Sequence, residues 1–210
     1  MTITNGYLTT DEARQYAGLS YDADTELLDD VVTAVSRAID QACQRHFWQT
    51  SAGTARYFES PMSATLHLGA FCDLVTVTEV KVDRDGDGTY EETITASDYA
   101  LGPANPSAAP EQRPYTELTL LNSVLFPVPG GSAGTGRVAL TRITGTWGWP
   151  AVPAAVKQAC RIQVARIVKR QESPMGVAGF GEFGVVRLTK LDPDVDSMLQ
   201  PYKLAAYGIA

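Results

Sequence analysis

The spacing of apolar residues changes twice along this chain of 210 residues, and the change limits the folds open to it. As far as Phe47 the apolar residues recur every three or four positions, as they do on one face of a helix. Between Thr54 and Thr146 they recur at every second position, which is typical of half-buried strands, and helical spacing returns after Pro153. This order predicts an α+β fold, a small helical bundle with an inserted antiparallel β subdomain.

Four helices are predicted, near residues 9–17, 22–47, 153–172 and 192–204. Thr9 and Glu12 have the spacing of a capping box, and Asp192 followed by Pro193 is a typical helix start. The helix near 22–47 carries one continuous apolar stripe, formed by Leu27, Leu28, Val31, Val32, Val35, Ala38, Ile39, Ala42 and Cys43. Its opposite face is polar and includes Asp40.

Short strands are predicted in the middle of the chain, at residues 54–59, 64–68, 75–82, 90–94, 99–101, 117–121 and 137–144. They are rich in β-branched and aromatic residues, and clusters of Gly, Pro, Asp and Ser separate them. Gly145, Gly148 and Pro150 are expected to end the last strand. Trp147 and Trp149 lie in the joint that leads into the next helix, where large rings can anchor a helix to a sheet.

Composition excludes several classes of protein. Net charge is −7 and the isoelectric point is about 4.8, which argues against tight binding to a phosphate backbone. No apolar run is long enough to predict a membrane span, and the N-terminus has no signal-peptide pattern. Three scattered cysteines do not form a disulfide framework. A cytoplasmic site of synthesis is therefore expected.

Asp83, Asp85 and Asp87 match the opening of a calcium loop, because carboxylates at alternate positions can meet one cation. The twelfth position of such a loop is Ile94, where a glutamate is needed, and no helix is predicted beside the segment. The pattern therefore favours an exposed β-hairpin tip with residues chosen for turn geometry. A calcium-binding β-rich module using these three aspartates is the alternative function.

Motifs that resemble enzyme signatures lie in the wrong context. Residues 130–134 match the hydrolase elbow around Ser132, yet a strand is predicted after them and both histidines precede them. Residues 179–184 match a nucleotide-binding fingerprint, yet they follow a helix and not a strand. Cys43 and His46 could supply half of a metal site, but no second pair lies nearby. The sequence predicts neither an enzyme nor a bound cofactor or metal.

The helix near 153–172 is basic toward its end, through Lys157, Arg161, Arg166, Lys169 and Arg170. These cations either complement the helix dipole or face DNA or an acidic partner. The Gly-rich stretch after this helix also holds apolar side chains, which on a loop often become buried against a partner.

Two separated groups of motifs carry a resemblance to a known family. Near the N-terminus stand YLTTDEA and YAGL, followed by the long helix; near the C-terminus stand GTWG, VPAAVKQA and LDPDV. This pattern resembles the head–tail connector (adaptor) proteins of tailed bacteriophages, over roughly residues 7–50 and 137–205. The middle of the chain is longer than in compact members of that family. It resembles them only in the kind of structure predicted, a β insertion, and not in its motifs.

The resemblance implies a structural protein of the virion neck that forms a ring of twelve copies under the portal. Such a ring extends the channel for genomic DNA, which passes without specific binding, and offers a platform to the next neck protein, a stopper or tail-completion protein. The chain would be a single connector domain, with N-terminal helices at 7–50, a β-rich insertion at 54–146, a long helix at 150–172 and a Gly-rich arm with the last helix at 173–210. It would reside in the virion, and in the host cytoplasm during assembly, with no membrane contact.

The resemblance also implies where the portal or a neighbouring subunit is contacted. The family's C-terminal segment tends to make the portal contact, and it maps here to the Gly-rich arm and the last helix. The candidate docking residues are Phe180, Phe183, Val185, Val186, Leu188, Leu191, Val195, Leu199 and Tyr202.

Overall fold

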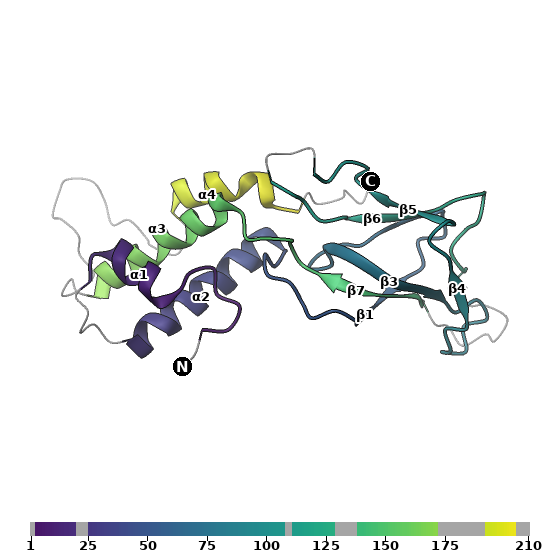
Figure 1. The fold of residues 1–210 in the computed structure, drawn as a ribbon, viewed down its shortest axis with the longest axis horizontal. Coiled ribbons are helices and arrows are strands. Elements are labelled where there is room, and N and C mark those ends of the chain that lie inside the picture. The colour runs from purple at the N-terminus through teal and green to yellow at the C-terminus, as the bar shows by residue number, and fades with distance from the viewer. Residues whose placement is uncertain (1–2, 20–24, 108–110, 129–137, 172–191, 205–210) are drawn as a thin grey trace. The chain divides into compact units, whose positions relative to one another are not determined.

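The computed structural model describes residues 3–19, 25–107, 111–128, 138–171 and 192–204 (Figure 1). It divides into two compact units. The helical unit consists of residues 1–44 and 152–210, and the β unit is the continuous stretch 45–151. The mixed α+β class and the antiparallel sheets predicted from the sequence are confirmed.

The central element of the helical unit is α3 (Ala154–Gln171). It packs against α1 (Thr10–Ala17), α2 (Thr25–Cys43) and α4 (Pro193–Leu199), and Figure 1 shows it beside α2 and α4. A short 3-10 helix, η2 (Gln200–Tyr202), continues α4. The core of this unit includes Leu28, Val32, Val35, Ile39, Val156, Ala159, Val164, Val195 and Leu199.

The predicted helix signals at both ends of the chain are confirmed. The Thr9 hydroxyl accepts from the Glu12 amide while the Glu12 carboxylate accepts from the Thr9 amide, so the capping box before α1 is complete. Gly18 ends α1 in the left-handed conformation, at φ 72°. Asp192 caps α4 by accepting from the Asp194 amide, with Pro193 in the first turn.

The long helix α2 differs from its prediction in two respects. It ends at Cys43 and not at residue 47, because Gln44 adopts a left-handed conformation at φ 53°. Its stripe is also narrower than predicted, since Leu27 is 47% exposed and Ala38 is exposed as well. Asp40, assigned to the polar face, is instead buried among groups that come from distant parts of the chain.

Two antiparallel sheets form the β unit. In the first, β7 (Ala139–Trp147) pairs with β1 (Thr54–Glu59) on one side and β3 (Leu74–Val82) on the other, and β3 pairs with β4 (Glu92–Ile94). The second sheet has the order β2 (Thr65–His67), β6 (Glu117–Leu120) and β5 (Tyr99–Gly102). The two sheets contribute to one core, which includes Phe58, Leu66, Leu74, Val80, Leu118, Ile143 and Trp147.

The predicted strands match the observed ones closely, and the main error concerns Gly145. This glycine lies inside β7, opposite Thr54 and Val77, instead of ending the strand. A Cβ placed on Gly145 would lie 2.1 Å from the Thr76 carbonyl oxygen. The position therefore takes glycine because another backbone approaches closely there, and not because the strand stops. Within the described residues, no helix is both long and apolar enough to cross a membrane.

Candidate interaction surfaces

Three of the predicted docking residues lie in the core of the helical unit. Val195 and Leu199 are 0% exposed and Tyr202 is 8% exposed, since α4 packs on α3 and η2 continues α4. The Leu204 amide donates to the Cys43 carbonyl at 3.0 Å, so the chain after η2 is also fixed to the end of α2. Val195, Leu199 and Tyr202 therefore hold the subunit together, which corrects the expectation that they form an open docking surface.

The other predicted docking residues lie outside the described part of the chain: Phe180, Phe183, Val185, Val186, Leu188 and Leu191.

The five basic residues of α3 divide into paired and exposed side chains. Arg161 lies 3.4 Å and Lys157 4.0 Å from the Glu12 carboxylate of α1, and Arg166 forms an ion pair with Asp192. The Thr9 amide, followed by Lys157 and Arg161, lowers the pKa of Glu12. Lys169 and Arg170 are exposed in the last turn, where cations stabilise a helix end. The charge available to a partner from this helix is therefore concentrated at its C-terminal end.

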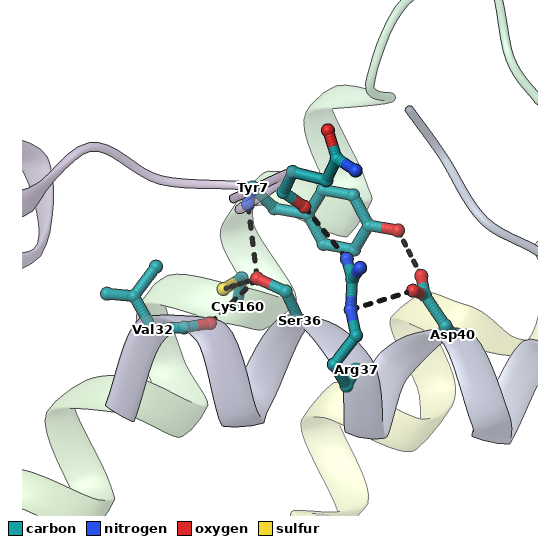
Figure 2. A network of polar contacts seen from close by, with 7 residues as sticks. Tyr7, Val32, Ser36, Arg37, Asp40 and Cys160 are labelled. Atoms are coloured by element: carbon teal, nitrogen blue, oxygen red, sulfur yellow. Dashed lines mark hydrogen bonds and ion pairs between the residues drawn. The ribbon is translucent and has the colours of Figure 1, made fainter. Parts of the chain in front are cut away.

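A buried polar network fixes the N-terminal segment to α2 and α3 (Figure 2). The Tyr7 hydroxyl donates to Asp40, whose second oxygen lies 3.1 Å from Nε of Arg37. The Tyr7 amide donates to the Ser36 hydroxyl at 3.1 Å, and Ser36 lies 3.9 Å from the thiol of Cys160 on α3. Sequence spacing does not reveal this network, because Tyr7 and Asp40 are distant in the chain.

Asp40 makes the stability of the helical unit depend on pH. Burial raises the pKa of Asp40 to about 6, although Tyr7 and Arg37 favour the charged form. The unfolded carboxyl titrates near pH 4, so this group stabilises the fold below that pH and the contribution is lost as pH rises through about 6. Because an asparagine side chain cannot ionise, the free energy of unfolding of Asp40→Asn relative to wild type is expected to rise by roughly 2–3 kcal/mol between pH 4 and pH 7.

Urea unfolding followed by helical circular dichroism at several pH values measures this difference. If the free energy of unfolding of the variant relative to wild type is the same at pH 4 and pH 7, the pKa of Asp40 is not raised in the folded protein. Asp30→Asn, at an exposed position of the same helix, is the matched control.

A second buried carboxylate, Asp73, fixes the two ends of the β unit to each other. Its oxygens lie 2.9 Å from Nη1 of Arg45 and 3.0 Å from Nε1 of Trp149. The Gly148 amide also donates to the Asp73 carbonyl at 2.8 Å. Burial raises the pKa of Asp73 to about 6, against the opposing effects of Arg45 and Trp149. We call Arg45, Asp73, Gly148 and Trp149 the junction clamp, since it holds the chain where it enters and leaves the unit.

The junction clamp explains the tryptophan–glycine joint that stands out in the sequence. Gly148 has φ 106°, and a Cβ there would lie 1.8 Å from the Trp48 carbonyl oxygen. Trp149 packs on Phe47 with ring centroids 5.2 Å apart, while Trp147 lies in the sheet core. Both tryptophans are thus buried in the β unit, and the glycine between them allows the entering and leaving chains to touch.

The aspartate-rich segment connects β3 to β4, as the hairpin prediction requires, but its first aspartate is buried. The two oxygens of Asp83 accept from the amides of Gly86 and Gly88 at 2.7 and 2.8 Å. The carboxylates that approach one another within 4.8 Å are Asp83, Asp85 and Glu91, so Asp87 is not in this group. Backbone amides already satisfy the charge of Asp83, which explains the turn without a cation.

The double variant Asp85→Asn, Asp87→Asn is expected to keep the wild-type melting temperature, with or without calcium. The side-chain oxygens of Asp85 and Asp87 each accept one backbone amide, and an asparagine oxygen can do the same. Thermal unfolding with calcium or with a chelator tests this, and Asp83→Ala should melt lower in both. A calcium-dependent rise of several degrees in wild type alone would instead show a bound ion.

Three described side chains of types that often act in catalysis lie in buried or paired positions: Cys160, His46 and His67. Burial raises the pKa of the Cys160 thiol to about 12, so it is not a nucleophile at neutral pH. His67 is half exposed and lies 3.4 Å from Glu117 across the β2–β6 pair. His46 packs against Trp48 and Phe71. Ser132 and residues 179–184 lie outside the described residues.

Comparisons with known proteins identify the fold. No protein-family model matches the sequence, and no curated protein matches it. A chain from the neck of an empty GTA particle, computed with C6 symmetry, superposes with a TM-score of 0.60 at 17% identity, over 100% of this chain and 96% of that one. Chains from the virion of a native gene transfer agent (GTA) particle and from a native GTA neck computed with C12 symmetry give TM-scores of 0.58 and 0.55, with the same identity and coverage. At this identity the likeness establishes that the chain shares the fold of these neck and virion chains.

Proposed function

We propose that this chain is a structural subunit of the neck of a tailed phage or a phage-like particle. The observation that carries the proposal is the full-length likeness, which spans 100% of this chain and 96% of a GTA neck chain. A shared motif or small domain would align only part of each chain. The independent resemblance of residues 7–50 and 137–205 to head–tail adaptors supports the same role.

Within the neck, the proposed position is the adaptor ring directly under the portal. The helical unit and the β unit would act together as one connector subunit, in a ring of twelve copies. The ring would extend the DNA channel and offer a platform to the next neck protein. A net charge of −7 supports this role, because acidic walls do not retain phosphate as DNA slides past. Free subunits would occupy the host cytoplasm until assembly.

The portal contact is proposed to involve the apolar residues of the Gly-rich arm, especially Phe180 and Phe183. Their sequence combines glycines, which raise the entropy of the free chain, with apolar side chains that gain from burial on a partner. Because α4 completes the helical core, truncation before the arm would damage the fold. The double variant Phe180→Ser, Phe183→Ser is the cleaner change.

Co-sedimentation of the purified chain with purified portal rings tests the proposed function. Wild type is expected to sediment with the portal, and the double variant is expected to bind at least 10-fold more weakly while melting at the wild-type temperature. If wild type remains in the supernatant at every concentration, the portal role fails. If the variant binds like wild type, the role stands and the arm is not the contact.

A further inference from the structure

The outer face of the first sheet carries an aromatic and basic row that crosses three strands. Tyr57 on β1 lies directly opposite Arg142 on β7, and Arg142 lies opposite Lys81 on β3. The alternate residues of β7, such as Thr141 and Ile143, point into the core. The row is therefore on the face turned away from the second sheet, and we call it the outer row.

Specific contacts hold the outer row in place. Arg142 lies 5.6 Å from the ring centre of Tyr90 and donates to Glu79 at 2.9 Å. Tyr57 and Tyr90 pack with ring centroids 5.6 Å apart, and the Tyr90 hydroxyl donates to the Ala139 carbonyl at 2.7 Å. Lys81 lies 3.4 Å from Glu79. The rings and the guanidinium are thus prearranged by the sheet, which lowers the entropy lost when a partner binds.

The chemistry of the outer row favours a protein partner. Tyr57 is 59% exposed although its ring is largely apolar, and Tyr and Arg are the residues that most often anchor protein interfaces. The outer row contains two cations, Arg142 and Lys81, and Glu79 neutralises one of them. The row therefore keeps one positive charge, although the whole chain is acidic. A single excess charge beside a carboxylate is a poor match for a phosphate backbone.

We propose that the outer row binds an acidic surface on a second copy of this chain, an inference that rests on the proposed ring function. Because the chain carries net charge −7, approaching copies repel each other unless a local basic patch meets an acidic surface. Two outer rows cannot face each other, since both are positive. The outer row therefore meets a different surface of the second copy, and in the proposed ring such a contact is head-to-tail.

Two substitutions at Tyr57 test the proposal as a matched pair. Tyr57→Glu and Tyr57→Lys both remove the ring, but they add opposite charges at the same exposed position. Against an acidic neighbour, Tyr57→Glu is expected to weaken ring assembly about 100-fold and Tyr57→Lys no more than about 10-fold. Val128→Ser, at a β-unit position that is 66% exposed, controls for the loss of any exposed apolar side chain and should assemble normally.

Analytical ultracentrifugation over a range of concentrations, with and without portal, measures assembly, and thermal unfolding confirms that each variant folds. Equal assembly of Tyr57→Glu and wild type would overturn the proposal, as would an equal loss in the two Tyr57 variants, since charge would then play no part. A defect seen only in portal binding would assign the outer row to the portal instead. If wild type forms no ring under any condition, the proposed function itself fails. This result differs from failure of the outer-row proposal, in which wild type assembles and the Tyr57 variants do not show the expected order.

Discussion

Replacing Gly148 with alanine is expected to lower the free energy of unfolding of the β unit by at least about 3 kcal/mol. Two costs add at this position. The backbone has φ 106°, which side chains rarely adopt, and the new Cβ would lie 1.8 Å from the Trp48 carbonyl oxygen. Backbone atoms form this obstacle, so a change of rotamer cannot relieve it. The entering and leaving chains would have to separate, and the junction clamp would open.

Tryptophan fluorescence during urea unfolding measures this effect selectively, because Trp48, Trp147 and Trp149 all lie in the β unit. Gly53→Ala is the matched control. Gly53 also has a positive φ of 79°, but nothing lies within 4 Å of its added Cβ, so only the backbone cost of about 1 kcal/mol applies. Equal losses for the two variants would show that the close approach to Trp48 does not matter.

Asp73→Ala is expected to cost the β unit roughly 3–5 kcal/mol at pH 7. The substitution leaves the guanidinium of Arg45 without its partner at 2.9 Å, in a site where both side chains are mostly buried. It also removes the acceptor for Nε1 of Trp149. A buried charge without a partner costs far more than the net contribution of the pair.

A double variant separates these two effects. Asp73→Ala with Arg45→Met should recover part of the loss, because the uncompensated charge is then gone. Glu92→Ala removes a partner of Arg84 in an exposed ion pair and should cost no more than about 1 kcal/mol. If Asp73→Ala costs no more than Glu92→Ala by fluorescence-detected unfolding, the junction clamp does not stabilise the unit.

Local signals in the sequence predicted most of the elements. The capping box at Thr9, the glycine stop at Gly18 and the Asp192 cap each act within a few residues, so they can be read directly. The strand β1 was predicted with its observed bounds, since alternation and flanking turns are also local. The end of α2 was missed because the left-handed conformation of Gln44 has no local signal.

The other errors share a cause, which is packing between residues far apart in the chain. Gly145 looks like a strand break until Thr76 is known to lie against it. Asp40 looks like a solvated residue until Tyr7 is placed over it. Val195 and Leu199 look available for docking until α4 is seen to pack on α3.

The candidate site was predicted less well than the fold for the same reason. A docking surface is defined by which apolar residues remain exposed after folding, and periodicity does not give this. The outer row was not predicted, because Tyr57, Arg142 and Lys81 become neighbours only through strand register. Its one available signal was a tyrosine on an edge strand, at a position that alternates with the buried Phe58.

The most direct test of the proposed neck role is electron microscopy of the purified chain mixed with its portal, reconstructed without imposed symmetry. We expect one closed ring of twelve copies, coaxial with the portal and open along its axis. Wild-type protein that folds but binds the portal as single copies, or does not bind, would contradict the claim that this chain is a ring-forming neck subunit.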